Sequence, residues 1–309
     1  MPELPEVHTT VTQLKKRLPG LAITNVWSRY DSSHYREKKN IKDKRYFKTF
    51  KKEVSGKKIH DVERRGKFVL IHLSDEISIL VHMKMTGHLL YGTYRRTTAR
   101  EQKQFNEVWV AERAGPLRDP FNRFVHLVFS LSNGKHLVLS DMRKFASVFA
   151  YHRHTPPKGV TTLGPDPLDR SFTFKAFLER LPYASKKTIK QILLDQTFLA
   201  GIGNIYSDEI LWSAGVHPHS APKVIPRKSL YKMYSAMKNI LRKGVDFGGD
   251  STSDYRQPDG TPGSFHYHHK AYRETGKPCP QRGCKGVIRR TTVGGRGTHY
   301  CDRHQVLYR

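Results

Sequence analysis

Cysteine is scarce in this sequence of 309 residues: there are three, and all of them lie after residue 278. So few thiols exclude a secreted scaffold built on disulfides, and they favour a reducing compartment such as the cytosol or a nucleus. No apolar run reaches the length of a membrane span, and the first residues do not have the pattern of a secretory signal peptide. We therefore expect an intracellular chain without a membrane partner.

Acidic residues are also scarce. The chain has 27 Asp and Glu against 55 Lys and Arg, which gives a formal net charge of +28. Because the excess is spread along the whole chain, it indicates a polyanionic partner, with nucleic acid as the first choice. Ribosomal-type RNA binding and membrane-surface binding are the alternatives. The length allows a sizeable core and about two domains.

The hydrophobic pattern changes from strands to helices near the middle of the chain. Apolar segments predict strands, with a hairpin turn at Asn133-Gly134, in residues 21–28, 57–90, 107–112 and 123–142. Helical periodicity follows in residues 173–181, 187–199, 204–214 and 228–244. Strands followed by helices predict an α+β protein with an N-terminal β-sandwich or barrel. The basic stretches 32–56 and 93–122 are expected to be mainly loop, the first with a short helix.

The chain starts with Met1-Pro2-Glu3-Leu4-Pro5-Glu6. Once Met1 is removed, Pro2 carries a secondary amine whose pKa is near ~8, so it is partly unprotonated at neutral pH. Such an amine can attack an electrophilic sugar carbon and form an iminium. Glu3 and Glu6 lie at the start of a predicted helix, where carboxylates are favoured. The alternative is an ordinary tail that leads into a surface helix.

The C-terminal residues contain two close pairs of metal ligands. They are Cys279 and Cys284, then Cys301 and His304 after sixteen intervening residues, a spacing that predicts a structural Zn²⁺ site. Between the pairs, Arg296 follows Gly294-Gly295 at a predicted hairpin tip and could approach a phosphate closely. Taken alone, Arg296 could equally be a solvated surface charge.

A glycine-rich turn lies between two helical segments at Gly201-Ile202-Gly203-Asn204. Its glycines would let backbone approach a phosphate, and Asn204 would cap the next helix and donate from its side chain. A plain corner between two helices is the alternative.

Four stretches of the chain resemble the formamidopyrimidine-DNA glycosylase/endonuclease VIII family. They are PELPEV at the start, GIGNIYSDEILWSAGVHP (201–218), SDYRQPDGTPGSF (253–265) and GRGTHYC (295–301). The resemblance implies an N-terminal β-sandwich with flanking helices, a helical domain with a helix–two-turn–helix, and a zinc-finger β-hairpin. On this basis the domains are expected at 1–152, 169–265 and 266–309, with a linker at 153–168 and a base-covering loop at 246–266.

The resemblance also implies roles for individual residues. Pro2 would attack C1′ of the damaged nucleotide, and Glu3 would be the general acid/base. Lys67 would contact the phosphate or the lesion beside the attacked sugar and assist elimination. Arg296 would bind phosphates that flank the lesion and take part in the second elimination. Supporting residues in the lesion pocket would be Glu6, Glu209 and Tyr255.

Further residues are expected to bind DNA. Met85, Arg143 and Phe145 would fill the gap left by the flipped nucleotide. Lys190 and Asn204 would hold backbone phosphates. Arg123 could replace a DNA-contacting histidine, because Phe124 stands where the family commonly has that histidine.

The sequence departs from the family pattern at several positions. Met142 replaces the proline of the usual Asp-Pro-Arg, so the backbone of that loop could differ. His8 replaces a common glutamate, and His304 replaces the usual fourth cysteine, with zinc binding expected to survive. The basic stretches 32–56 and 93–122 are longer than is typical, and extra non-specific DNA affinity is one role for them.

The function that this resemblance implies is that of a bifunctional DNA glycosylase and AP lyase. It would excise oxidised purines (8-oxoguanine and formamidopyrimidines) from duplex DNA through a Schiff base at Pro2 and β,δ-elimination. Double-stranded DNA with oxidised bases or abasic sites would be the partner of a monomer, in a bacterial-type, nucleoid-associated cytoplasmic setting. The alternatives are an oxidised-pyrimidine glycosylase, a non-catalytic binder of damaged DNA, and an RNA-binding zinc protein.

Overall fold

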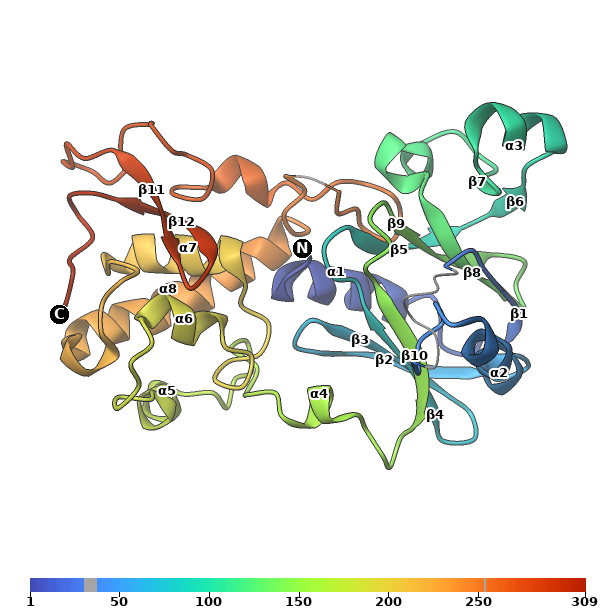
Figure 1. Ribbon diagram of the computed structural model, residues 1–309, viewed down its shortest axis with the longest axis horizontal. Helices are drawn as coiled ribbons and strands as arrows, with labels where there is room; N and C mark the ends of the chain where they lie inside the picture. The colour runs from blue at the N-terminus through green and yellow to red at the C-terminus, as the bar shows by residue number, and fades with distance from the viewer. Residues whose placement is uncertain (31–37, 253) are drawn as a thin grey trace. The chain divides into compact units, whose positions relative to one another are not determined.

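The computed structural model describes residues 1–30, 38–252 and 254–309 (Figure 1). The chain forms two compact units. The N-terminal unit comprises Met1–Thr161 and Gly248–Ser264, and the C-terminal unit comprises Thr162–Phe247 and Phe265–Arg309. The expected scheme assigned residues 169–265 to one helical domain, whereas Gly248–Ser264 makes its contacts within the N-terminal unit. We refer to this segment as the 248–264 loop.

The N-terminal unit is a β-sandwich of two four-stranded antiparallel sheets, as the sequence predicts. One sheet has the strand order β1 (Ile23–Ser28), β8 (Val125–Leu131), β9 (His136–Asp141), β5 (Gly87–Gly92). The other has the order β10 (Ser147–His152), β4 (Ile77–His82), β3 (Phe68–Leu73), β2 (Ile59–Arg65). Apolar side chains of both sheets, such as Ile71 and Leu127, share one buried core, which is the arrangement expected of packed antiparallel sheets.

Two helices cover this sandwich. Helix α1 (Leu4–Lys15) packs against β2 and β3, and its buried face includes Val7, Val11 and Leu14 at helical spacing. Helix α2 (Lys44–Val54) contacts β1 and β10 and begins where the Asp43 side chain accepts from Tyr46 N. Helix α2 is the short helix expected in the basic stretch 32–56, of which residues 32–37 lie outside the described residues.

The basic stretch 93–122 has more regular structure than the sequence predicts. It contains a hairpin of β6 (Tyr94–Arg96) and β7 (Trp109–Ala111), helix α3 (Ala99–Phe105), and the 3₁₀ turns η2 (Pro116–Arg118) and η3 (Pro120–Asn122). Only the strand near residues 107–112 was expected. Helix α3 begins at a capping box of Thr98 and Glu101, a local signal that the weak hydrophobic periodicity hides. A one-turn helix α4 (Lys158–Thr161) ends the first part of the N-terminal unit.

The C-terminal unit is helical and ends in a β-hairpin. Its helices are α5 (Phe174–Arg180), α6 (Ile189–Leu194), α7 (Asn204–Ala214) and α8 (Arg227–Asp246), with 3₁₀ turns η4 (Pro222–Val224) and η5 (Phe265–His268). The hairpin pairs β11 (Ile288–Val293) with β12 (Arg296–Cys301). The predicted helices agree with these elements, except that α6 is shorter than expected and ends at Leu194, with Asp195 as its cap. The residue before α7 in the cap position is Gly203, so the expectation that Asn204 is the cap is wrong.

A buried ion pair connects three of these elements. The Lys190 side chain on α6 is completely buried, and its Nζ donates to Asp208 Oδ1 on α7 and, at 2.8 Å, to Thr298 Oγ1 on β12. Asp208 Oδ2 also accepts from the backbone N–H of His299 at 2.9 Å. Because these charges are removed from water, each depends on its partners for stabilisation.

Replacing one member of this pair should therefore be costly. We expect Lys190→Ala to lower the free energy of unfolding by about 3–5 kcal/mol, because Asp208 would keep its charge in a buried site. The matched control is Lys187→Ala, which removes an exposed pair with Asp195 and should cost less than about 1 kcal/mol. Urea denaturation of the two variants compares these effects, and equal losses would contradict a buried network.

Candidate functional site

The N-terminal residues form a compact turn at the start of α1. Pro2 is buried, and Glu3 occupies the cap position with extended backbone. The backbone N–H of Glu3 donates to Glu6 Oε2 at 2.7 Å, and both residues are only 2% exposed. The positive end of the helix stabilises carboxylates here. The geometry thus places two acidic side chains within one helical turn of Pro2.

The 248–264 loop is attached to this turn through the second oxygen of Glu6. Glu6 Oε1 accepts from Asp250 N at 2.7 Å, and Tyr255 Oη donates to the Glu6 carbonyl at 2.9 Å. Burial raises the pKa of the Tyr255 phenol, so it remains a donor. A Cβ at Gly249, where φ is +89°, would lie 2.9 Å from Glu6 Cγ, so glycine is required. The structure therefore brings together Glu6 and Tyr255, two of the residues expected in the lesion pocket.

Lys67 lies on the tight turn between β2 and β3, the hairpin against which α1 packs. Gly66 supplies the left-handed residue of this turn, and Lys67 is 7% exposed. Burial, followed by the nearby ammonium groups of Lys84 and Lys67, lowers the pKa of His82 to about 3. His82 is therefore neutral at physiological pH, and the two lysines make this part of the surface attractive to an anion such as a phosphate.

Met85, Arg143 and Phe145 project from two turns whose backbones are joined. Met85 is 38% and Phe145 45% exposed, unusual values for large apolar side chains. The guanidinium carbon of Arg143 lies 4.5 Å from the centre of the Phe145 ring. Lys84 and Lys144, which directly precede Met85 and Phe145, both have left-handed backbone with φ near +55°. Each turn thus directs an apolar side chain outward.

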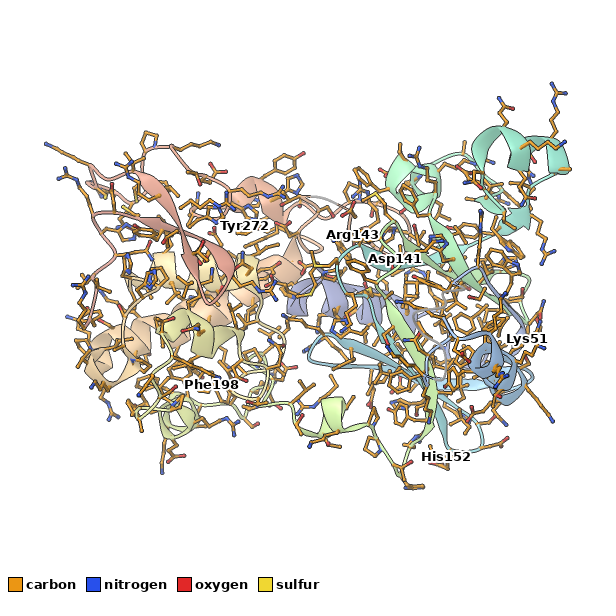
Figure 2. All side chains as sticks on the ribbon, viewed as in Figure 1. Lys51, Asp141, Arg143, His152, Phe198 and Tyr272 are labelled. Carbon is orange, nitrogen blue, oxygen red and sulfur yellow. The ribbon has the colours of Figure 1, made fainter. Side chains whose placement is uncertain are left out.

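The connection between the two turns is made by Thr86, a residue that the sequence analysis missed. Thr86 Oγ1 accepts from Arg143 N at 3.0 Å and donates to Asp141 Oδ1. Asp141 is completely buried, and its Oδ2 accepts from Tyr30 Oη at 2.9 Å and from Ala146 N at 2.8 Å. Figure 2 labels Asp141 and Arg143, which lie close together in that view. The sequence offered no pattern that identifies this polar network, since its members lie far apart along the chain.

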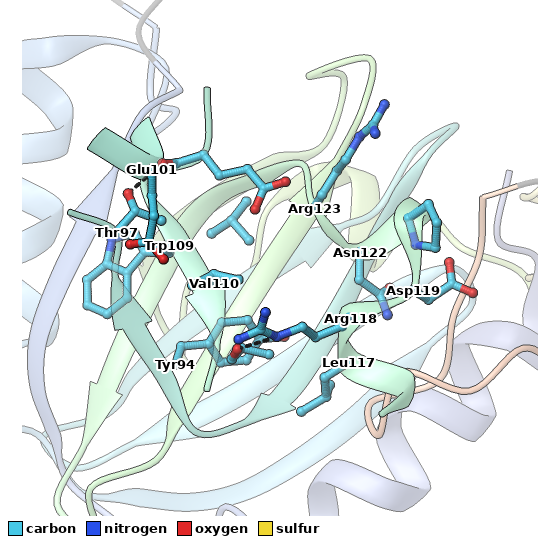
Figure 3. Close-up of a pocket in the computed structure, with 14 residues that line it drawn as sticks. Tyr94, Thr97, Glu101, Trp109, Val110, Leu117, Arg118, Asp119, Asn122 and Arg123 are labelled. Carbon is cyan, nitrogen blue, oxygen red and sulfur yellow. Dashed lines mark hydrogen bonds between the residues drawn. The ribbon is translucent and has the colours of Figure 1, made fainter. Parts of the chain in front are cut away.

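Arg123 lies at the rim of a cavity in the stretch 93–122. The cavity has a volume of about 320 Å³ and is lined by Tyr94, Trp109 and Glu107, among others (Figure 3). Burial raises the pKa of Glu107, and the charges of Arg123 and Arg118 oppose this shift. The Arg123 side chain itself is exposed and its guanidinium carbon lies 4.9 Å from the centre of the Phe124 ring. It can therefore reach a partner in solution.

In the C-terminal unit, Glu209 is buried on α7 and accepts three backbone N–H groups. They belong to Lys270, Ala271 and Tyr272, at 2.8–2.9 Å. Burial raises the pKa of Glu209, against the opposing effect of these hydrogen bonds. The carboxylate thus fixes the segment that leads into the cysteine-containing region.

The position of Lys190 does not fit the expected phosphate contact. Its ammonium is enclosed by Asp208 and Thr298 and has no exposed surface. A phosphate could reach it only if this buried pair opened. Lys190 therefore connects α6 to α7 and β12. We expected it to hold a DNA phosphate, but in the structure its role is to stabilise the fold.

Asn204 and Arg296 are brought together at the hairpin turn. Gly294 and Gly295 both have positive φ, as a two-residue hairpin turn requires, and Arg296 follows them as an exposed side chain. Asn204 Nδ2 donates to the Gly297 carbonyl at 2.9 Å. The second N–H of this amide and the Arg296 guanidinium are both donors suited to phosphate oxygens.

Cys279, Cys284, Cys301 and His304 form a metal-binding cluster. Their ligand atoms all lie within 4.8 Å of one another, with 3.6 Å between the sulfurs of Cys284 and Cys301. This is close to the edge of about 3.8 Å expected for a tetrahedron with Zn–S bonds of about 2.3 Å. His304 Nε2 lies 2.9 Å from the Trp212 carbonyl, which places the proton on Nε2 and leaves Nδ1 facing Cys279 as a ligand. The four residues therefore fit a tetrahedral metal ion.

Among the residues that the structure describes, no helix combines the length and the apolar character that crossing a membrane requires.

Known proteins resemble this chain over nearly its whole length. The family model for the formamidopyrimidine-DNA glycosylase N-terminal domain matches residues 1–148, and that for the formamidopyrimidine-DNA glycosylase H2TH domain matches residues 163–256. The formamidopyrimidine-DNA glycosylase of Pelotomaculum thermopropionicum is 35% identical over 309 residues, covering 99% of this chain and all of that protein.

Solved structures agree with these matches. A complex of a Lactococcus lactis FPG mutant with Fapy-dG containing DNA has a TM-score of 0.79 at 30% identity, covering 98% of this chain and 99% of that one. The structure of MutM in complex with carbocyclic 8-oxo-G containing DNA has a TM-score of 0.78 at 30% identity, with the same coverage. Two domain families in the expected order, together with identity along the full length, place this chain in the formamidopyrimidine-DNA glycosylase family of base-excision repair enzymes.

Proposed function

We propose that this protein is a bifunctional DNA glycosylase and AP lyase that removes oxidised purines from duplex DNA. The observation that carries the proposal is the buried N-terminal turn, in which Pro2 directly precedes Glu3 and lies one helical turn from Glu6. The purine assignment is supported by the DNA in the two related complexes, which contains Fapy-dG in one and carbocyclic 8-oxo-G in the other.

The chemistry requires that Met1 be removed, because the nitrogen of Pro2 is otherwise an amide without a nucleophilic lone pair. The free Pro2 amine attacks C1′, and the bond between C1′ and the damaged base breaks, with the base leaving as it gains a proton. Glu3 supplies a proton to the sugar ring oxygen, which opens the ring and leaves an iminium at C1′. The iminium acidifies the neighbouring C–H, so that the 3′ phosphate and then the 5′ phosphate are eliminated. Lys67 binds the adjacent phosphate and stabilises its charge as it leaves.

Binding of double-stranded DNA by a monomer is the second part of the proposal. Met85, Phe145 and Arg143 enter the gap that the flipped nucleotide leaves, two as apolar wedges and one as a donor to the orphaned base. Arg296, Asn204 and Arg123 contact phosphates. The net charge of +28 should make the affinity fall steeply as the salt concentration rises, because each phosphate contact releases counterions.

A Zn²⁺ ion held by Cys279, Cys284, Cys301 and His304 completes the C-terminal hairpin. When bound, the ion provides a structural cross-link and no reactive group. Gly286 N donates to Cys284 Sγ at 3.2 Å and Arg303 N to Cys301 Sγ at 3.4 Å, hydrogen bonds that stabilise thiolate ligands. The cluster thereby fixes β11 and β12, and with them the turn that presents Arg296.

The test of the chemistry is borohydride trapping on a duplex with 8-oxoguanine opposite cytosine, after mass spectrometry has established removal of Met1. The wild type should form a covalent adduct. Pro2→Gly should form it about 100-fold more slowly, because a flexible primary amine no longer holds the reacting atom in place. Pro5→Ala, in the same helical turn, keeps the terminal amine and serves as the control.

The substrates in this test separate the alternatives. An adduct on an oxidised pyrimidine but not on 8-oxoguanine would assign the protein to the pyrimidine branch. Absence of any adduct, even on an abasic site, would leave a non-catalytic DNA-binding protein.

The wedge residues can be tested through Thr86. Thr86→Val removes the acceptor of Arg143 N and the donor to Asp141. If these hydrogen bonds contribute about 1.4 kcal/mol to binding of damaged DNA, their loss should reduce the preference for damaged over undamaged duplex about tenfold. Fluorescence anisotropy with both duplexes measures this ratio, and Thr49→Val on the exposed surface of α2 is the control. An unchanged ratio would contradict a positioning role for Thr86.

The metal site can be tested through Cys279. The wild type should contain about one zinc ion per chain, and Cys279→Ser should lose most of it because a tetrahedral site needs all four ligands. Elemental analysis measures the zinc content, and duplex affinity should fall with it. The control His219→Gln changes a histidine outside the cluster and should retain the metal. If Cys279→Ser loses the metal but binds duplex DNA with normal affinity, the ion is not needed for DNA binding.

A further inference from the structure

The 248–264 loop has a second support besides α1, and it comes from the stretch 93–122. Three of its residues meet this stretch or the strand before it. Arg256 reaches Asp119 and Phe121, the backbone of Gly260 lies against Pro116 and Leu117, and the Pro258 carbonyl accepts from Tyr91 N at 2.7 Å. The loop is therefore in contact on both sides within the N-terminal unit.

The main side-chain contact is a partly buried ion pair. Arg256 is 6% exposed, and its Nε lies 3.2 Å from Asp119 Oδ2. Its guanidinium carbon lies 4.5 Å from the centre of the Phe121 ring, within the range of a cation–π interaction. Arg256 Nη1 also donates to the Tyr255 carbonyl at 2.8 Å. We refer to these three side chains as the Asp119–Phe121–Arg256 cluster.

Asp119 is itself fixed by the fold. Its Oδ1 accepts from Phe121 N at 2.8 Å, which caps the turn η3 and holds the carboxylate towards Arg256. Figure 3 shows Asp119 and Asn122 on the same side of the cavity in this stretch. The cluster therefore has one rigid partner, Asp119, and one partner on the loop, Arg256.

A backbone contact reinforces the cluster. Gly260 has a φ of +90°, and a Cβ there would lie 2.5 Å from the Pro116 carbonyl carbon, so only glycine allows this approach. Asn122 is buried, and its Nδ2 donates to the Pro116 carbonyl at 2.8 Å and to the Gly260 carbonyl at 3.4 Å. His88 Nε2 lies 2.9 Å from Asn122 Oδ1 and orients that amide.

The cluster is directly connected to the residues of the candidate site. Arg256 follows Tyr255, whose hydroxyl donates to the Glu6 carbonyl, while Asp250 N donates to Glu6 Oε1. A displacement of Arg256 therefore moves Tyr255, and through it the part of the loop that lies on Glu6. Asp119 and Phe121 thus act on the site through Arg256 without being part of it.

We propose that the Asp119–Phe121–Arg256 cluster positions the 248–264 loop for recognition of the damaged base, so that the stretch 93–122 contributes to lesion specificity. This rests on the proposed function. The cluster matters for substrates that still carry a base and not for an abasic site, which has no base to recognise. Asp119, Phe121 and Arg256 are positioning residues in this proposal.

The experiment measures the activity of two charge-removing variants on two substrates, a duplex with 8-oxoguanine and a duplex with an abasic site. Asp119→Asn preserves an acceptor for Phe121 N while removing the charge, and Arg256→Gln removes the guanidinium. Each should lower kcat/KM on the 8-oxoguanine duplex about tenfold, which is about 1.4 kcal/mol of transition-state stabilisation. Strand cleavage at a preformed abasic site should be unchanged. The double variant should lose no more than either single variant, because both remove the same interaction.

The matched control is Glu101→Gln. It removes an ion pair with Arg95 in the same stretch, with no contact to the loop, and glutamine preserves the capping box. It should leave both substrates unaffected. Hydrogen exchange gives a readout that does not depend on activity: the amides of Gln257 and Gly260, which donate to Thr261 and Gln257 carbonyls, should exchange faster in Asp119→Asn and Arg256→Gln.

Each outcome is decisive. Equal losses of kcat/KM on both substrates, accompanied by a lower Tm, would show that the cluster only stabilises the fold. Unchanged kinetics and unchanged hydrogen exchange would show that the cluster does not position the loop. If the wild type does not act on 8-oxoguanine at all, the purine assignment fails. In that case the positioning role is still tested by the hydrogen exchange of the loop amides and by the kcat/KM of the variants on the damaged base that the wild type does remove.

Discussion

The Glu6 carboxylate is the group on which the candidate site depends. One oxygen accepts the backbone N–H of Glu3 and the other accepts that of Asp250, so a single side chain fixes both the start of α1 and one end of the 248–264 loop. Both hydrogen bonds are buried, where a missing partner is expensive. The requirement for glycine at position 249 follows from the same close approach. The residue proposed as the nucleophile and the loop proposed to recognise the base therefore share one point of attachment.

The surface proposed to enter DNA depends on a similar arrangement. Asp141 accepts from Tyr30, Thr86 and Ala146, and so joins an N-terminal segment to the turns that carry Met85 and Phe145. Burial, together with the Asp141 carboxylate, raises the pKa of Tyr30 and keeps its hydroxyl a donor. Met142 stands where the family usually has proline. In this chain the hydrogen bonds of Asp141 and Thr86 fix the turn that a proline ring would otherwise restrict.

Local patterns were sufficient to predict most of the architecture. Alternating apolar residues identified the sandwich strands, helical periodicity identified α5 to α8, and ligand spacing identified the metal cluster, because each depends on neighbours in sequence. Lys190 was misjudged, since a lysine in a basic protein is normally exposed and its buried partners Asp208 and Thr298 are distant in the chain. Helix α3 was missed because its capping box is not accompanied by hydrophobic periodicity. The contacts of Arg256 were missed because Asp119 and Phe121 lie far from it in the sequence. The N-terminal residues and the glycines before Arg296 suggested the chemistry of Pro2 and Arg296, whereas the role of Lys67 came from the family resemblance alone.

The division of the chain into units has a consequence for biosynthesis. The 248–264 loop belongs to the N-terminal unit, although the segments on either side of it belong to the C-terminal unit. Domains usually fold as their residues leave the ribosome, beginning with the N-terminal one. Here the sandwich can form early, but Glu6 meets Asp250 only after helices α5 to α8 have been synthesised. The candidate site around Glu6 is therefore completed late in synthesis, after the helices α5 to α8 and not together with the sandwich that carries it.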